Sequence, residues 1–443
     1  SAPVPVCLHL DHCTDIAYCK TCADAGYTNI MIDASKQAYE ENIRQTKEVV
    51  DYCHKLGNIS VEGELGTVSG VEDQVKVAED EAQLANPKQA VEFVERRLGA
   101  QQRVQVAHPA RDAAVRLLVD QGHVVLGARS GFEGLLAGDV KELDWMSVHG
   151  WVSQGGAELG TSRKVPSAGE LGALAGVLAA RQVEGILLVG GWAAYQAAFA
   201  MQAARAAWAA FRIPIVCVPA GIDNSLPGSE LSIGADTALN AIVEAVDKIK
   251  QSAVAWRRAF VVEVMGRFCG YLAVMSGLAT GAERVWTHEE GITMAALEKD
   301  VEGLAEGFRK GKRLALMIRN ENASPVFTTD FLRRLLEEEG RGQFDSRQAI
   351  LGHLQQGGDP TPFDRIVAIR PSARAVEVLL EESAKDDPAA CYLGFQAGRL
   401  TAFPLADFPS QVEEAFERAK APWWRAVEPV VRLLGQPGPG AAA

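Results

Sequence analysis

Basic and acidic side chains stand at the ends of predicted strands in the second part of the chain, several of them beside glycine. The set comprises Asp223, Arg258, Arg267, Glu321, Arg347 and His353. Arginine forks and histidine donors bind phosphate groups, and carboxylates accept hydrogen bonds from sugar hydroxyls. Each of these residues taken alone is more often part of a surface salt bridge or a helix cap. Together they predict an anion site suited to a sugar phosphate.

A second group of candidate ligands lies near the N-terminus. A His-Leu-Asp-His string at residues 9–12 follows a predicted strand, and Asp33 and Glu64 follow two further strands in the same way. Side chains at the ends of neighbouring parallel strands converge on one face, where Asp11, His12, Asp33 and Glu64 could hold a divalent cation. The alternative is that they are ordinary polar residues at strand ends.

The elements that must position these side chains alternate between strand and helix. Strands are predicted over residues 4–8, 28–32, 59–62, 103–106, 124–128, 185–189, 213–219, 259–264 and 314–318. Helices are predicted over residues 14–25, 39–56, 86–97, 234–251 and 328–338. This alternation predicts an α/β fold with mostly parallel sheets, whose sites lie at the carboxyl ends of the strands.

The use of basic residues changes sharply along the chain. Residues 1–96 contain six lysines and two arginines, whereas residues 97–443 contain nine lysines and 27 arginines. This change predicts two segments of different origin, 1–97 and 98–443, joined near residues 97–102. The last residues, 435–443, are Gly, Pro and Ala with one Gln, so we expect a disordered tail there.

Charge and composition exclude several classes of partner. The formal net charge of −13 argues against nucleic acid and anionic membranes, because both bind basic surfaces. No apolar run is long enough to span a bilayer, and the first residues lack the pattern of a signal peptide. The eight cysteines are spread along the chain, with Cys19 and Cys22 inside a predicted helix, where packing is the favoured role. We therefore expect a cytoplasmic protein with reduced thiols.

Residues 100–430 resemble the C-terminal half of a eukaryotic-type phosphofructokinase. The matching stretches are residues 155–163, 228–240 and 345–365, together with the Trp pair at 423–424. The resemblance implies Rossmann-type parallel sheets with helices on both faces and a fructose phosphate as the ligand. In eukaryotic C-terminal halves, the equivalent pocket binds the activator fructose 2,6-bisphosphate.

The resemblance also assigns roles to individual residues. Asp223 matches the catalytic base that accepts the proton of the sugar 1-hydroxyl, and Arg163 matches the arginine that contacts the transferring phosphoryl group. The sugar-contacting residues would be Arg267, Glu321 and His353. Two further arginines, Arg258 and Arg347, match residues that reach the sugar phosphate from a neighbouring subunit. This implies a homo-oligomer or a subunit of a larger phosphofructokinase assembly.

The departures from the family pattern fall on the nucleotide side. The catalytic motif Thr-Ile-Asp-Asn-Asp reads Gly-Ile-Asp-Asn-Ser at 221–225, and the magnesium-binding Asp is replaced by Trp192. The Gly-rich loop for ATP is shortened to residues 107–111, and an arginine of a later motif is Gln356. An indole cannot coordinate Mg²⁺, and without its ligands phosphoryl transfer loses most of its electrostatic stabilisation. Use of Mg²⁺ and ATP is therefore doubtful.

These features favour a regulatory or weakly active half that binds fructose 6-phosphate or a fructose bisphosphate. An active ATP-dependent 6-phosphofructokinase is the alternative, supported by Asp223, Arg163 and Arg267. Both hypotheses place the ligand in the same pocket, and they differ only in whether a phosphoryl group is transferred.

Residues 3–96 resemble class II fructose-bisphosphate aldolases. The resemblance includes Asn42, Thr46 and residues 70–73 and 86–87. It implies that His12 is a zinc ligand, that Asp11 is the acid/base, and that Asp33 and Glu64 lie near the metal. A complete barrel needs roughly 250 residues, so this segment predicts only a partial (β/α) barrel. An aldolase-type zinc enzyme and a passive fused segment remain as alternatives.

Overall fold

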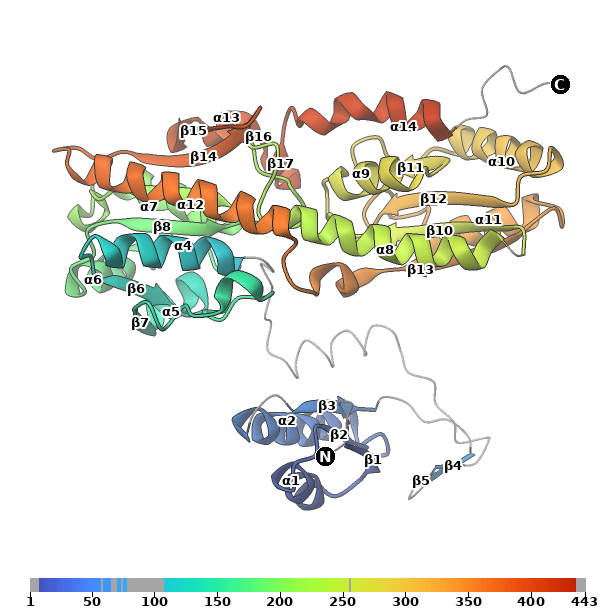
Figure 1. Cartoon of the computed structure of the whole chain (residues 1–443), viewed down its shortest axis with the longest axis horizontal. Helices are drawn as coiled ribbons and strands as arrows, with labels where there is room; N and C mark the ends of the chain where they lie inside the picture. Colours follow the sequence, from blue (N-terminus) through green and yellow to red (C-terminus); the bar gives the residue numbers. More distant parts are fainter. Residues whose placement is uncertain are drawn as a thin grey trace. The chain divides into compact units, whose positions relative to one another are not determined.

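The computed structural model describes residues 8–56, 59–64, 70–72, 75–77, 107–254 and 256–435. The chain divides into two compact units, residues 1–101 and 102–443 (Figure 1). The join expected near residues 97–102 lies outside the described residues, as do the helix predicted over 86–97 and the strand predicted over 103–106. Within the described ranges, no helix has both the length and the apolar character that a membrane span requires.

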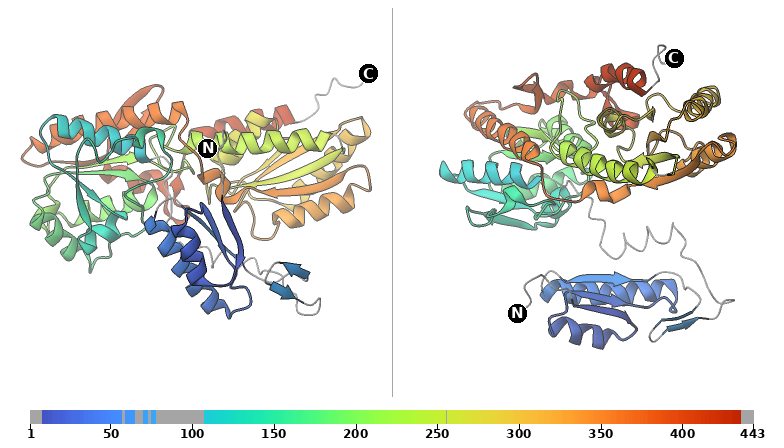
Figure 2. Two further views of the ribbon diagram at one scale, coloured as in Figure 1. Left: turned by 60° about the horizontal axis from the view of Figure 1, so that its bottom comes forward. Right: turned by 45° about the vertical axis from the view of Figure 1, so that its right-hand side comes forward.

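The first unit is built on a parallel sheet with the strand order β1-β2-β3. The strands are β1 (His9–Cys13), β2 (Asn29–Ile32) and β3 (Ser60–Gly63), with α1 (Ile16–Asp24) and α2 (Tyr39–Leu56) between them. Both helices lie beside the sheet (Figure 2). They pack against it through one apolar cluster of mostly cysteine, isoleucine and valine side chains. A short antiparallel ribbon follows in the sequence, formed by β4 (Gly70–Glu72) and β5 (Val75–Val77).

The strand predicted over residues 4–8 lies almost entirely outside the described residues. Helix α2 has the bounds predicted for it, and the first described strand is His9–Cys13. The His-Leu-Asp-His string is therefore itself part of a strand. The three strands form an open sheet, and the described residues of this unit do not close into a barrel.

The second unit contains two larger sheets, the first with the strand order β15-β14-β9-β8. Its strands β8, β9 and β14 are parallel, and β15 pairs antiparallel at the edge. Alternate residues of each strand face opposite sides, so Ile215 and Cys217 pack in one apolar cluster and Val216 and Val218 in another. The elements of this half are α4 (Ala107–Asp120), α6 (Leu171–Ala180), β8 (Ile186–Gly190), α7 (Trp192–Ala204), β9 (Ile215–Pro219), α12 (Pro362–Ser383), β14 (Ala390–Gln396) and β15 (Arg399–Pro404).

The second sheet of this unit is fully parallel, with the order β11-β12-β10-β13. Its strands are β10 (Arg258–Val264), β11 (Arg284–Trp286), β12 (Leu314–Asn320) and β13 (Asp345–Ile350). Helices α8 and α9 contribute to the apolar cluster on one face, and α10 and α11 to the cluster on the other. These helices are α8 (Ala235–Val254), α9 (Tyr271–Thr280), α10 (Met294–Arg309) and α11 (Thr329–Glu339).

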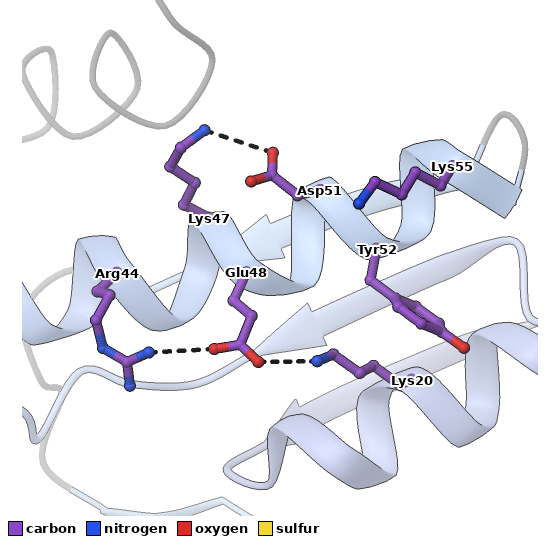
Figure 3. A pocket seen from close by; sticks show the side chains of 7 residues that line it. All are labelled: Lys20, Arg44, Lys47, Glu48, Asp51, Tyr52 and Lys55. Carbon is purple, nitrogen blue, oxygen red and sulfur yellow. Dashed lines mark hydrogen bonds and ion pairs between the residues drawn. The ribbon is translucent and has the colours of Figure 1, made fainter.

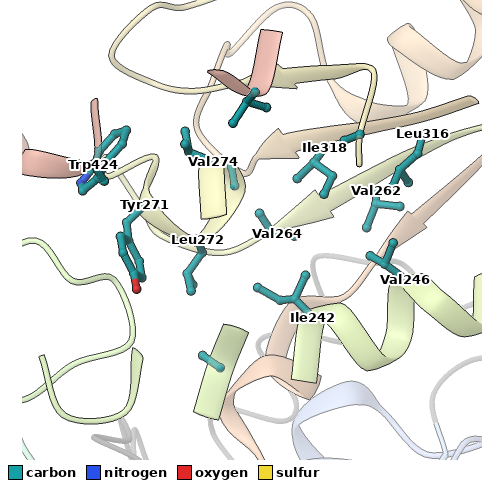
Figure 4. Packing of buried hydrophobic residues seen from close by; sticks show 14 of the residues in the cluster. Ile242, Val246, Val262, Val264, Tyr271, Leu272, Val274, Leu316, Ile318 and Trp424 are labelled. Atoms are coloured by element: carbon teal, nitrogen blue, oxygen red, sulfur yellow. The ribbon is translucent and has the colours of Figure 1, made fainter. Parts of the chain in front are cut away.

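The sequence of β10 shows why both faces of this sheet are covered. Val262 and Val264 pack with Ile242 of α8 and Leu272 of α9 (Figure 4). Val261, which precedes Val262, belongs to the cluster on the opposite face. A strand with apolar side chains on both faces is buried on both sides, which is the pattern of parallel sheets. The predicted α/β fold with helices on both faces is confirmed for this unit.

Smaller elements complete the second unit. Near its start, β6 pairs antiparallel with β7, and near its end β16 pairs antiparallel with β17. Their bounds are β6 (Val125–Ala128), α5 (Gly131–Ala137), β7 (Val140–Leu143), α13 (Phe408–Gln411), β16 (Val412–Glu413), β17 (Arg418–Ala419) and α14 (Glu428–Gly435). Short 3-10 turns include η4 (Gly352–Gln356), η6 (Glu414–Phe416) and η7 (Trp423–Val427). The expected tail begins inside α14 at Gly435, and residues 436–443 lie outside the described residues.

The two longest helices of the second unit meet at their N-termini. Asp364, in the first turn of α12, accepts hydrogen bonds from the backbone N–H of Gly234 and Thr237 at 3.0 and 2.7 Å. In the other direction, Thr361 at the start of α12 donates to the carboxylate of Asp236 in the first turn of α8 at 2.5 Å. Carboxylates are stabilised at helix N-termini by unpaired N–H groups and by the helix dipole. This junction ties the helix along one sheet to the helix along the other (Figure 1).

The shortened loop expected at residues 107–111 is not a loop. These residues form the first turn of α4, and Pro109 stands in that turn. Proline is tolerated there because the first N–H groups of a helix have no intrahelical acceptor. The segment that stands in the place of the family's nucleotide-binding loop is therefore helical from Ala107 onward.

Candidate functional site

Asp223 lies in the loop that follows β9, and its neighbour Asn224 fixes that loop. The side-chain oxygen of Asn224 accepts a hydrogen bond from the backbone N–H of Ser232 at 2.7 Å, and its amide donates to the carbonyl of Glu230 at 2.8 Å. Asn224 has a positive φ of 50°, a conformation that asparagine tolerates better than most residues. The carboxylate of Asp223 is thus presented from a turn with little freedom.

Arg267 lies in a tight turn after β10, and Glu321 follows β12 directly. The carboxylate of Glu321 accepts hydrogen bonds from the backbone N–H of Gly266 at 3.1 Å and of Arg267 at 2.6 Å. Gly266 has a φ of 131°, and a Cβ there would lie 2.4 Å from the carbonyl oxygen of Cys269. Glycine is therefore required at this position. The neighbouring strands of one sheet hold Arg267 and Glu321 in a fixed relation.

The charges of Asp223, Arg163, Arg267 and Glu321 act on one another. Burial raises the pKa of Asp223 to about 6, the negative charge of Glu321 adds to this, and Arg267 and Arg163 act against it. Burial also lowers the pKa of Arg163, and the charge of Arg267 lowers it further. The four predicted residues therefore lie near enough for their charges to interact. A carboxylate with a pKa near 6 can exchange a proton close to neutral pH.

Glu417 belongs to the same site but was not among the sequence candidates. Its carboxylate forms an ion pair with the Arg267 guanidinium at 2.5 Å, and its charge also raises the pKa of Asp223. It lies between η6 and β17, 150 residues along the chain from Arg267. No local pattern joins two residues so far apart, so only the fold could identify this contact.

Arg258 and Arg347 lie away from this group. Both approach Asp345, at 3.8 Å from the Arg258 side chain and 3.6 Å from that of Arg347. Arg258 is the first residue of β10, whereas Arg267 follows the end of that strand. A strand rises about 3.3 Å per residue, so the two ends of β10 are roughly 20 Å apart. His353 is exposed in η4, which follows β13 near the carboxyl ends of the strands.

Trp192 begins α7 directly after Gly190 and Gly191. Its indole is buried in the core cluster of the first sheet and packs against Phe408 with a ring separation of 5.3 Å. Its Nε1 has no hydrogen-bond partner among the described residues. The indole of Trp192 packs against apolar neighbours and has no oxygen atom that could bind a metal ion.

Three of the N-terminal candidates form a separate cluster in the first unit. One potential ligand atom each from His12, Asp33 and Glu64 lies within 4.8 Å of the others. His12 has a positive φ of 43°, and the pairing of β1 with β2 is irregular around it. Asp33 and Glu64 directly follow β2 and β3, so the predicted convergence at the strand ends is found. Asp11 is not part of the cluster, because its side chain is exposed and pairs with His9.

Hydrogen bonds and neighbouring charges favour the protonated form of His12 in this cluster. Burial alone would lower the pKa of His12, but its hydrogen bond with Asp33 and the charge of Glu64 outweigh burial and raise it. Ser35 donates to Asp33 at 2.6 Å, and Asn42 donates to the backbone carbonyl of Glu64 at 2.8 Å. One imidazole and two carboxylates form a donor set that fits a divalent cation such as Zn²⁺ with positions left for other ligands.

A surface pocket in the first unit lies between α1 and α2 and is rich in charged side chains (Figure 3). Its charges are largely paired with one another. Glu48 bridges Lys20 at 2.8 Å and Arg44 at 3.1 Å, and Lys47 lies 3.4 Å from Asp51. Exposed pairs of this kind contribute little to stability and form an ordinary solvated helix surface.

Comparison with known proteins extends these observations. Residues 104–379 match the family model of Phosphofructokinase, which covers more than half of the chain. The chain belongs to the phosphofructokinase family. Residues 1–101 match the model of Fructose-bisphosphate aldolase class-II.

Individual phosphofructokinases are similar over the second unit. The platelet-type ATP-dependent 6-phosphofructokinase of Rattus norvegicus is 40% identical over 337 residues, which is 73% of this chain and 42% of that protein. The ATP-dependent 6-phosphofructokinase of Dictyostelium discoideum is 41% identical over 321 residues, covering 72% of this chain and 38% of the relative. The chain therefore spans less than half the length of these relatives.

Solved phosphofructokinases share the fold. The phosphofructokinase of Saccharomyces cerevisiae superimposes with a TM-score of 0.71 and 32% identity, over 76% of this chain and 47% of that chain. The T-state structure of the Pichia pastoris phosphofructokinase gives a TM-score of 0.70 and 31% identity, over 76% and 39% of the two chains. The recognition of the family from sequence is confirmed.

Proposed function

We propose that the second unit binds a fructose phosphate and acts as a regulatory or weakly active phosphofructokinase half. The observation that carries this proposal is that the charges of Arg163 and Arg267 act on Asp223, while the position of the magnesium ligand holds a buried indole. Two guanidinium groups beside a carboxylate suit a phosphate and a sugar hydroxyl.

The nucleotide side supports recognition over transfer. Transfer of a phosphoryl group needs a metal ion and backbone donors that neutralise the developing charge. Trp192 offers no oxygen ligand, and the residues that would form the phosphate loop are the first turn of α4. The relatives are named as ATP-dependent enzymes, so ATP and Mg²⁺ belong to the alternative function.

Isothermal titration of the full chain with fructose 6-phosphate and with fructose 2,6-bisphosphate tests this proposal. We expect saturable binding of at least one of the two sugars, lost in Arg267→Ala. Absence of binding to the oligomeric protein would refute it. The alternative, an active kinase, predicts ADP formation in a coupled assay with ATP, Mg²⁺ and fructose 6-phosphate, abolished in Asp223→Ala.

A second candidate function belongs to the first unit, where His12, Asp33 and Glu64 could bind a divalent cation. The compact geometry of the three groups favours this proposal, and the match to class II aldolases gives it a chemical context. A bound ion would be held by these side chains and would act as a Lewis acid. Titration of the purified chain with Zn²⁺ should show one site per chain that is absent in His12→Ala, and equal binding by the variant would refute it.

A further inference from the structure

The ion pair between Glu417 and Arg267 has a direct bearing on ligand binding. Both side chains are 37% exposed, so the pair lies at the accessible surface of the site and not in the core. Arg267 is also one of the two guanidinium groups whose charge acts on Asp223. The carboxylate of Glu417 therefore pairs with the same guanidinium group, that of Arg267, which the proposed ligand would bind.

A carboxylate and a phosphate compete for the same donors. Both accept N–H bonds from a guanidinium, and Glu417 takes one from Nη1 of Arg267. A phosphate that uses Nη1 as one of its two donors must therefore displace Glu417. The exchange is uneven in charge, because Glu417 carries one negative charge and a phosphate monoester carries close to two at neutral pH. A neutral ligand gains no electrostatic energy by displacing Glu417 from Arg267. A dianionic phosphate is attracted to Arg267 more strongly than the singly charged Glu417 is.

The residues that follow Glu417 are held in place by hydrogen bonds. The next residue, Arg418, is buried and donates to the carbonyl of Phe268 at 2.6 Å and to Glu413 at 2.7 Å. The backbone N–H of Ala419 donates to the carbonyl of Ser225 at 2.8 Å, within the loop that carries Asp223. Release of Arg267 can thus occur by rotation of the Glu417 side chain without loss of the β16–β17 hairpin.

We propose that Glu417 is a specificity-determining residue of this pocket. It competes with a phosphate group for Arg267, and so lowers the affinity of the pocket for phosphate esters while leaving its affinity for neutral sugars unchanged. This inference rests on the proposed function, because it concerns the same site and the same class of ligand.

Titration of Glu417→Gln against the wild-type chain tests this inference, with fructose 6-phosphate, inorganic phosphate and unphosphorylated fructose as ligands. We expect the variant to bind fructose 6-phosphate and inorganic phosphate about 5-fold more tightly, because the exposed ion pair no longer opposes them and the site is less negative. Binding of fructose should not change, and so the selectivity for the phosphorylated sugar should rise.

Two further variants guard against indirect effects. Glu417→Gly removes the carboxylate and also relieves the positive φ of 49°, so a tighter complex in both variants cannot come from a damaged fold. Glu414→Gln removes a carboxylate from the same hairpin without touching Arg267 and should bind as wild type does.

The outcomes distinguish a failure of the inference about Glu417 from a failure of the proposed function. If the wild-type chain binds phosphorylated sugar and Glu417→Gln binds it equally or more weakly, the inference is wrong and the proposed function stands. If neither wild type nor any of the variants binds phosphorylated sugar, the proposed function fails, and the inference falls with it.

Discussion

Among single residues, Asp223 shows how position sets chemistry. Its type and its place after a strand could be predicted from the sequence, but its pKa of about 6 depends on burial and on the charge of Glu321. Both effects come from residues brought together by the fold. A carboxylate held partly protonated near neutral pH is a suitable proton acceptor for a sugar hydroxyl.

The raised pKa of Asp223 predicts a pH-dependent effect on stability. Its folded pKa of about 6 exceeds the ordinary value of 3.8, so its contribution to stability is fully present below pH 3.8 and is lost as the pH rises through 6. Asp223→Asn should therefore be more stable than wild type at pH 7.5, by at most roughly 3 kcal/mol for a shift of about two units. The difference should shrink towards zero near pH 4.

Urea denaturation between pH 4 and pH 8 measures this difference. Asp120→Asn, which removes an exposed carboxylate at the end of α4, is the matched control and should show no comparable trend. A stability difference for Asp223→Asn that does not vary with pH would contradict the assignment.

The places of several predicted site residues relative to the strands could be read from the local sequence. Asp223, Arg267 and Glu321 each follow a strand, and strand ends meet at one edge of a parallel sheet. Asp11 does not join the metal-ligand cluster, because it lies within β1 and its exposed side chain pairs with His9. Glu417 could not be found, since its partner is set by tertiary structure alone.

At the scale of elements, Asp364 joins the N-termini of α12 and α8. The residue is 1% exposed, and its carboxylate accepts two backbone hydrogen bonds and one from the Thr237 hydroxyl. Asp364→Ala leaves these buried donors without an acceptor, and each such loss costs about 1–3 kcal/mol. We expect the free energy of unfolding of the second unit to fall by roughly 2–4 kcal/mol.

Thermal and urea unfolding of Asp364→Ala should be compared with those of Asp386→Ala. Asp386 is exposed, and its replacement should change stability by less than about 0.5 kcal/mol. Equal stability of the two variants would show that the helix junction does not depend on this carboxylate.

The elements themselves were predictable to different degrees. Helix α2 was found at its predicted bounds because its apolar residues recur at helical spacing over 18 residues. The first turn of α4 was wrongly expected to be a loop, because the resemblance to a nucleotide-binding loop was followed in place of the helix-forming residues after Pro109. Short strands such as β11 give too weak a pattern to be placed from sequence.

For the whole molecule, the separation of Arg258 and Arg347 from Arg267 has a consequence for assembly. Roughly 20 Å separates the two ends of β10, so these arginines cannot reach a ligand bound at Arg267 of the same chain, and we predict that they contact the ligand of a neighbouring copy. We predict that Arg267→Ala and the double variant Arg258→Ala/Arg347→Ala each lose binding of fructose 6-phosphate, and that hybrids of the two regain part of it.

Hybrids carrying two different affinity tags can be isolated and titrated. A hybrid interface combines the intact Arg267 of one chain with the intact Arg258 and Arg347 of the other, so some sites are complete. Arg334→Ala, which removes an exposed arginine of α11, serves as a control and should bind normally. Hybrids that bind no better than their parents would contradict a shared site.

The rate at which buried cysteines are alkylated can report how often each unit opens. Cys13, Cys19, Cys22 and Cys53 are buried in the first unit, and Cys217, Cys269 and Cys391 are buried in the second. Burial raises the pKa of Cys19, and it raises that of Cys391 to about 11, so little reactive thiolate exists while the surrounding structure is closed. Alkylation resolved by peptide would therefore time the opening of one unit independently of the other, within a single unmodified chain.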